Sequence, residues 1–334
     1  MTGWFPPHLV PWAPVASFVV TWIVLAILLR TFSDRVLDHP NERSLHQQPM
    51  PRMGGVGVTA GIAVSVPFVS PAEWWPLWFG AALLVGISFL DDLVGLPIVG
   101  RLVMHFVAAG GFGAGLLVGQ IGVGWAVVAV VAMVWMTNLY NFMDGMDGLA
   151  GGMAVFGFGF LAVASWFAEN TSLALMSLSI ATASGAFLFF NFPPARIFLG
   201  DAGSTAFGFL AGGLGLIGWR DGTWSLWIPA LVFSPFIVDA TVTLLKRALQ
   251  GEPFWLAHRT HYYQRLVLSG WGHRKTVLAE YGLMVMCGVL ALAYQVAANS
   301  MRLIILGLWA LLMVSGVLGI HVAERMSTSL GAKG

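Results

Sequence analysis

Eleven long apolar segments, separated by short polar stretches, constrain the fold of this 334-residue chain more than any other feature. Hydrophobic residues make up 58% of the chain and charged residues only 9%, which is far more apolar than a soluble domain. The apolar runs are continuous and do not alternate with period two, so helices are favoured over a barrel. We predict an all-α, polytopic transmembrane helix bundle with about 11 spans. The expected spans are residues 11–29, 53–69, 76–90, 102–118, 124–139, 149–167, 173–190, 205–219, 224–245, 276–297 and 303–322.

The basic residues indicate the orientation of the bundle. With the N-terminus outside and the C-terminus inside, the inner connections hold 14 of the 16 Lys and Arg residues, and the outer ones hold only Arg220 and Arg302. Lys and Arg accumulate on the cytoplasmic side of membrane proteins, so we expect any functional site on that face. Residues 1–334 form one expected integral-membrane domain. Its expected cytoplasmic loops are 30–52, 91–101, 138–148, 191–204 and 246–275.

Most of the 15 carboxylates lie in these loops. Carboxylates gathered at a membrane surface repel one another and cost desolvation energy, so the arrangement needs a cation. Asp91 and Asp92 close one span, and Arg101 opens the next. Adjacent carboxylates on a helix point about 100° apart, so one can face a metal or substrate while the other faces a basic neighbour. A solvated helix terminus is the simpler alternative.

Four polar residues recur at intervals of three, namely Asn138, Asn141, Asp144 and Asp147. If this stretch is helical, all four share one broad face. Oxygen ligands on one face suit Mg²⁺, which binds carboxylates, waters and substrate phosphates. The alternative is that these residues cap a helix before Gly148, but capping needs only one of them.

Asp201 stands between Gly200 and Gly203 at the start of the eighth expected span, close to Ser204. Glycines allow close backbone approach, and the free N–H groups of a helix N-terminus attract an anion. This pattern predicts a metal or phosphate site, with a simple helix cap at Asp201 as the alternative.

The longest cytoplasmic loop carries His258, Arg259, His261 and Arg265, which are candidate phosphate donors. No Cys lies nearby, which argues against a zinc site, and an amphipathic surface segment is the alternative. Asp239 lies inside the ninth expected span. An ionisable residue at that depth has either a site role or a buried partner, and the sequence leaves both open.

Five motifs follow one another along the chain, namely Pro51-Arg52-Met53-Gly54-Gly55, Asp91-Asp92, residues 138–149, residues 198–204 and residues 258–265. Taken in order, they resemble those of the polyprenyl-phosphate N-acetylhexosamine-1-phosphate transferase family. The resemblance implies transfer of a sugar-1-phosphate from a UDP-amino sugar to undecaprenyl phosphate, with release of UMP. It also implies a bacterial inner (cytoplasmic) membrane location, the lipid bilayer as a partner, and Mg²⁺ as cofactor with Mn²⁺ as an alternative. No nucleic-acid partner is expected, and a homodimer is left open.

The resemblance also assigns roles residue by residue. It implies that Asp91, Asp92, Asp144 and Asp147 are the catalytic carboxylates and that Asp201, with Asp92, binds the metal. It places Asn141 and Asn191 in the nucleotide-sugar pocket and Arg101 near the lipid phosphate. The other expected substrate-binding residues are Arg52, Asn138, Gly200, Ser204, His258, Arg259, His261 and Arg265.

One departure from the family pattern affects the expected donor. Many relatives carry a His-rich run where this chain has His261-Tyr262-Tyr263-Gln264-Arg265. This resembles the branch that initiates O-antigen or related polysaccharides with 6-deoxy amino sugars, and flat tyrosine faces could pack on such a sugar.

Two other classes of membrane protein remain as alternatives. A CDP-alcohol phosphotransferase requires an Asp-Gly-x-x-Ala-Arg pattern that we do not find, and a secondary transporter would hold its charges near mid-bilayer.

Overall fold

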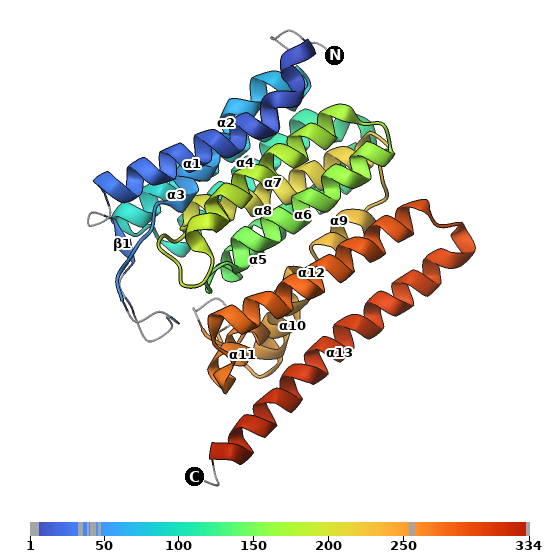
Figure 1. Ribbon diagram of the computed structural model, residues 1–334. Coiled ribbons are helices and arrows are strands. Elements are labelled where there is room, and N and C mark those ends of the chain that lie inside the picture. The colour runs from blue at the N-terminus through green and yellow to red at the C-terminus, as the bar shows by residue number, and fades with distance from the viewer. Residues whose placement is uncertain are drawn as a thin grey trace.

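The computed structural model describes residues 7–32, 36–38, 40, 45, 48–253 and 258–331. Within these ranges the regular secondary structure is helical except for one short antiparallel strand pair, β1 (Leu37–Asp38) and β2 (Met50–Pro51). Figure 1 shows the long helices side by side; α1 begins at one end of the bundle and α13 finishes at the other. The helices are α1 Ala13–Thr31, α2 Gly54–Val69, α3 Trp75–Val94, α4 Ile98–Leu116, α5 Val118–Phe142, α6 Leu149–Phe167, α7 Thr171–Asn191, α8 Asp201–Arg220, α9 Trp227–Val232, α10 Ser234–Leu249, α11 Tyr262–Leu266, α12 Gly272–Val296 and α13 Asn299–Gly331, with short turns of helix at η1 Pro7–Trp12, η2 Ala72–Trp74 and η3 Val267–Trp271.

The expected bundle of membrane-spanning helices is confirmed. Across the described ranges, nine helices are long and apolar enough to cross a membrane, and α2 is a shorter apolar helix of 16 residues. One expected span, 224–245, is wrong, because α9 and α10 divide it. Pro235, in the first turn of α10, has no N–H to bond the carbonyl of Leu231, and the Ser234 hydroxyl donates to that oxygen instead at 2.7 Å.

Helix α8 is the central element of the bundle. It is the most buried of the long helices and contacts α2, α3, α5, α6, α7 and α9, whereas α13 lies at the periphery. Apolar surface gains little by leaving lipid for protein, so close helix contact in a membrane depends on small residues at the interface. The many glycines of α8 satisfy this requirement. Its first residue, Asp201, is therefore surrounded by the ends of α2, α3 and α5.

The 51–55 stretch is laid against the start of α8 by close backbone contact. The N–H of Gly55 donates to the carbonyl of Leu199 at 2.7 Å, and a Cβ on Gly55 would lie 2.4 Å from the backbone nitrogen of Gly203. No residue other than glycine permits this approach at position 55. The contact explains the Gly pair of the first motif and places Arg52 beside Asp201.

Candidate active site

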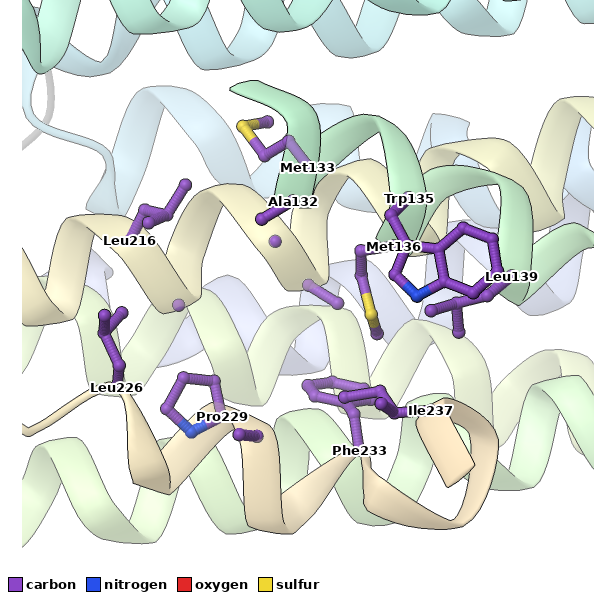
Figure 2. A pocket seen from close by; sticks show the side chains of 14 residues that line it. Ala132, Met133, Trp135, Met136, Leu139, Leu216, Leu226, Pro229, Phe233 and Ile237 are labelled. Atoms are coloured by element: carbon purple, nitrogen blue, oxygen red, sulfur yellow. The ribbon is translucent and has the colours of Figure 1, made fainter. Parts of the chain in front are cut away.

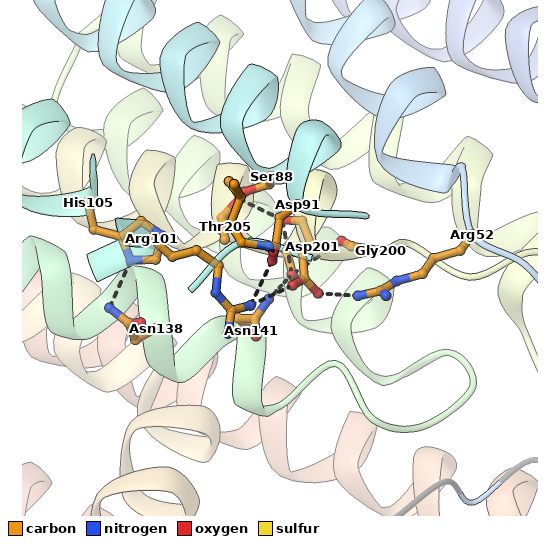
Figure 3. A network of polar contacts seen from close by, with 12 residues as sticks. Arg52, Ser88, Asp91, Arg101, His105, Asn138, Asn141, Gly200, Asp201 and Thr205 are labelled. Carbon is orange, nitrogen blue, oxygen red and sulfur yellow. Dashed lines mark hydrogen bonds and ion pairs between the residues drawn. The ribbon is translucent and has the colours of Figure 1, made fainter. Parts of the chain in front are cut away.

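Side-chain contacts bring all five expected cytoplasmic loops together at one end of the bundle. Figure 3 shows the centre of this cluster, where residues from α3, α4, α5 and α8 and from the stretch before α2 converge. The contacts that join the loops are Arg52 with Asp201, Arg101 with Asp201, Asn141 with Ser204, Asp147 with the backbone N–H of Ala195, and His273 with Asp147.

Two carboxylates and two guanidinium groups form the core of the site. Arg101 Nη1 lies 2.8 Å from Asp91 Oδ2 and 3.3 Å from Asp201 Oδ2, so both carboxylates converge on one cationic group (Figure 3). Arg52 donates to the other oxygen of Asp201. The side chains of Asp91 and Asp201 are only 8% and 19% exposed. The charges therefore balance within the cluster, and either partner could be exchanged for a metal ion or a phosphate.

Asp201 is not the N-cap of α8. Gly200 occupies that position, and Asp201 is the first helical residue, with its carboxylate turned toward the two arginines. Thr205 bonds the backbone carbonyl of Asp201 at 2.6 Å and lies 3.0 Å from the hydroxyl of Ser88, which ties α3 to α8. A carboxylate in this first turn is also favoured by the helix dipole.

The four polar residues at intervals of three do not share one helix face, and that expectation is wrong. Helix α5 ends at Phe142, so Asn138 and Asn141 lie on the helix, while Asp144 and Asp147 lie in the loop that follows. Asn141 donates to the buried hydroxyl of Ser204 at 2.9 Å, which fixes its amide beside Asp201.

The loop between α5 and α6 is held by buried polar groups. Asp147 accepts the N–H of Ala195 at 3.1 Å, and its other oxygen lies 3.2 Å from Nδ1 of His273 on α12. Asn191 is buried; it accepts the N–H of Gly148 at 2.9 Å and donates to a backbone carbonyl of the loop before α8. Its amide thus joins two loops in this structure, and its contact with a nucleotide sugar stays a prediction.

The candidate phosphate donors of the longest loop differ in their exposure and in their partners. Arg265 forms a bidentate pair with Glu324 of α13, at 2.7 and 2.6 Å, and His261 is 3% exposed. His258 is half-buried and Arg259 is exposed. Burial, followed by the charges of His261 and Arg247, lowers the pKa of His258 from 6.5 to about 4. His258 is therefore neutral near pH 7 and could offer a phosphate one N–H but no charge.

The sequence had indicated that Tyr262 and Tyr263 offer flat faces to a sugar, and that expectation is wrong. Tyr263 is fully buried, and Tyr262 is 7% exposed and covered by the guanidinium of Arg265 at 4.9 Å. These rings therefore belong to the packing of α11.

An apolar groove of about 390 Å³ opens from the charged cluster. Arg101, Asn138, Asn141 and Asp201 line its polar end, and side chains of α4 and α5 form apolar walls. His105, which lies one helical turn after Arg101 and 3.1 Å from Asn138, also lines it. Sequence reasoning missed His105, although its spacing of four from Arg101 was the available signal. The apolar wall residues are Ile98, Leu102, Phe106, Val131, Val134, Trp135, Phe142 and Leu244.

A second cavity, of about 200 Å³, lies among α5, α8, α9 and α10 (Figure 2). All of its lining residues are apolar, so it offers space for hydrocarbon and no chemistry. Trp135 lines both this cavity and the groove.

The donors at the core of the site fit a magnesium ion. Mg²⁺ in proteins takes one or two carboxylates and completes its shell with water and substrate phosphate. Asp201 and Asp91 supply two carboxylates that already converge on one cation, and the side-chain amide of Asn141 lines the same groove as Asp201. In the described part of the chain no group of three His, Cys, Asp or Glu residues could hold an ion by itself. The side chain of Asp92, the other expected ligand, lies outside the described part.

Comparison with known proteins places the chain in a family. The family model for glycosyl transferase family 4 matches residues 74–218, which include Asp91, Asn141 and Asp201. The decaprenyl-phosphate N-acetylglucosaminephosphotransferase of Mycolicibacterium smegmatis is 30% identical over 324 residues, a match that covers 80% of this chain and 77% of the relative. The chain belongs to glycosyl transferase family 4.

Two further relatives of this family 4 protein differ in the sugar that their names state. The probable undecaprenyl-phosphate N-acetylglucosaminyl 1-phosphate transferase of Bacillus subtilis is 28% identical over 290 residues, covering 80% of this chain and 81% of the relative. The phospho-N-acetylmuramoyl-pentapeptide-transferase of Listeria monocytogenes is 24% identical over 314 residues, covering 80% and 94%. The expected family is thus confirmed, and the expected O-antigen branch stays a prediction.

Proposed function

We propose that this family 4 protein transfers an N-acetylhexosamine-1-phosphate from a UDP-sugar to a polyprenyl phosphate at the cytoplasmic face of the membrane, releasing UMP. The observation that carries the proposal is the cluster of Asp91, Asp201, Arg52 and Arg101 at the polar end of an apolar groove. A site that joins a charged diphosphate donor to a lipid acceptor needs these two environments side by side. The names of the Mycolicibacterium and Bacillus relatives support the same reaction.

The groove fits the lipid acceptor. Arg101 stands at its mouth with 36% of its side chain exposed, so its guanidinium can exchange a carboxylate for the lipid phosphate. The apolar walls formed by α4 and α5 would then bind the first isoprenoid units. We propose undecaprenyl phosphate as the acceptor.

The reaction is a displacement at phosphorus. An oxygen of the lipid phosphate attacks the β-phosphorus of the UDP-sugar, and a new P–O bond forms. The bond from that phosphorus to the bridging oxygen breaks, and UMP leaves with the bridging oxygen and the electron pair. A phosphomonoester has its second pKa near ~6 and is largely ionised at pH 7, so no residue must remove a proton from it. The protein's task is to align the two phosphates and offset their repulsion.

The named residues divide this task. Asp201 and Asp91, with the amide oxygen of Asn141, would hold Mg²⁺, or Mn²⁺ as an alternative. When bound, this ion supplies positive charge to the donor diphosphate. Arg52 lies on the far side of Asp201 from Arg101, so the two guanidiniums can bind different phosphates (Figure 3). Asp144 and Asp147, in the loop after α5, are proposed to contact the donor.

The proposal for the donor is a 6-deoxy amino sugar and for the pathway an O-antigen-type or related cell-envelope polysaccharide. Its support is the Tyr263-Gln264 departure in the sequence. Because Tyr263 is buried, any discrimination would act through the position of α11 and not through stacking on the sugar.

The test is an exchange assay with purified protein, undecaprenyl phosphate, Mg²⁺ and a panel of UDP-amino sugars. We expect label from at least one UDP-HexNAc in the lipid phase, its loss on addition of EDTA, and return of label to UDP-sugar when UMP is added in excess. Glu73→Gln, an exposed substitution at the opposite end of the bundle, is the control that should retain the rate. Absence of transfer with every donor would contradict the proposal.

A further inference from the structure

Asp239 is buried in α10 and receives four donors. Its Oδ1 accepts the N–H of Tyr262 at 3.0 Å and the Thr243 hydroxyl at 3.1 Å, and lies 3.2 Å from Nδ1 of His261. Its Oδ2 accepts the N–H of Tyr263 at 3.1 Å. The first N–H groups of any helix lack partners within it, so Asp239 caps α11 from a different helix.

These contacts fix the imidazole of His261. A carboxylate only accepts hydrogen bonds, so the Nδ1 proton of His261 faces Asp239. The ring also stacks on Tyr263, with centroids 6.0 Å apart and planes 16° apart. The orientation of the His261 ring therefore depends on Asp239.

A second line of contacts runs from α11 to the loop that carries Asp144 and Asp147. The Tyr263 hydroxyl donates to the carbonyl of Phe142 at 3.3 Å, and a Cβ on Gly145 would lie 2.2 Å from that hydroxyl. The ring of Tyr263 is fully buried, so it cannot move without moving the loop. Because Asp239 holds the backbone of Tyr263, it also sets the position of the 143–148 loop.

From these contacts we propose that Asp239 is a positioning residue for the transfer reaction, setting His261 and, through Tyr263, the loop with Asp144 and Asp147. Three of these donors meet Oδ1 and one meets Oδ2, so both oxygens of the carboxylate are used. An amide at this position would turn an NH₂ group toward one of those donors. Stabilising a helix start needs only one acceptor, such as Ser or Asn, so the full set points to orientation of the neighbouring groups. This inference rests on the proposed function.

The test compares Asp239→Asn with two matched variants. Thr243→Val removes one donor to Asp239 and leaves the three contacts with residues 261–263, so its kcat should stay within twofold of wild type. Asp239→Asn should lower kcat at least tenfold while KM for both substrates changes less than twofold. Hydrogen exchange of residues 262–266, followed by mass spectrometry, should become faster in Asp239→Asn and stay unchanged in Thr243→Val.

A double variant separates positioning from general stability. If Asp239 acts through His261 and Tyr263, adding Asp239→Asn to His261→Gln should lower kcat by less than Asp239→Asn does alone. Tyr263→Phe, which keeps the backbone cap and removes only the hydroxyl with its contacts to Phe142, Gly145 and Gln264, should lower kcat while leaving exchange at the start of α11 unchanged. Full multiplication of the single effects, or an Asp239→Asn protein with wild-type kcat, would overturn the proposal. An inactive wild-type protein would refute the proposed function, whereas unchanged exchange in Asp239→Asn would refute the cap itself.

Discussion

The substitution Asp201→Asn separates the charge of the candidate metal ligand from its place in the fold. Asn has nearly the same size, Gly200 remains the N-cap of α8, and the backbone carbonyl still accepts from Thr205. The two arginines that pair with Asp201 have 29% and 36% of their side chains exposed, so water can solvate them once the charge of Asp201 is removed. The loss of stability should therefore stay near the roughly 0–1 kcal/mol of exposed ion pairs. The midpoint of thermal unfolding in detergent should therefore change little.

The effect on transfer should be far larger. The amide removes the charge that faces Arg52 and Arg101 and that Mg²⁺ would need, so we expect a rate loss of at least a hundredfold, or roughly 2.7 kcal/mol. The matched control is Asp221→Asn at the opposite end of α8, where the carboxylate pairs with Arg220 at 2.6 Å. That control should retain the rate. An Asp201→Asn protein with more than about a tenth of the wild-type rate, a loss under ~1.4 kcal/mol, would refute the metal role.

Three further predictions test the packing, the orientation and the long loop. In Gly55→Ala the new Cβ would lie 2.4 Å from a backbone nitrogen of α8, so both activity and the unfolding midpoint should fall; an unchanged protein would contradict the contact. With Cys287→Ala as background, cysteine at exposed Ser225 should react with an impermeant maleimide on intact cells and cysteine at exposed Gln250 should not; the reverse would invert the bundle. The pKa of His258 falls from 6.5 in the unfolded chain to about 4 in the folded protein, so the unfolded chain binds more protons between these two pH values. The stability that His258 contributes is therefore complete above pH 6.5 and is lost as the pH falls toward 4. In His258→Gln the melting temperature should fall less steeply over that window; identical slopes would refute the shift.

The long helices could be predicted because length and hydropathy alone decide them in a bilayer. The break at Phe233, between α9 and α10, could not be predicted, since Pro235 lies within a run that remains apolar throughout. Proline in a membrane helix is tolerated when a side chain such as Ser234 donates to the freed carbonyl, so a proline alone does not predict a break.

The candidate site, like the helices, could be predicted from the sequence only in part. Asp91, Arg101, Asn141 and Asp201 could be found because charges at a membrane surface need partners, and the structure brings them together. The pairing of Arg52 with Asp201 could not be found, because it depends on a glycine contact between segments nearly 150 residues apart. Spacing also failed for Asp144 and Asp147, since α5 ends before them.

The capping of α11 by Asp239 depends on tertiary contact alone. The sequence showed an ionisable residue in an apolar run and left its role open. Only the fold reveals that its partners are the backbone of residues 262 and 263 and the ring of His261.

The central claim is that phosphorus, and not the sugar alone, moves to the lipid. The most direct test uses a UDP-HexNAc labelled with ³²P in the β-phosphate, with purified protein, undecaprenyl phosphate and Mg²⁺. Attack at the β-phosphorus predicts that the label enters the lipid diphosphate and that the released UMP is unlabelled. Release of labelled UDP, with sugar but no label in the lipid, would mean that the glycosidic bond breaks instead and would contradict the account.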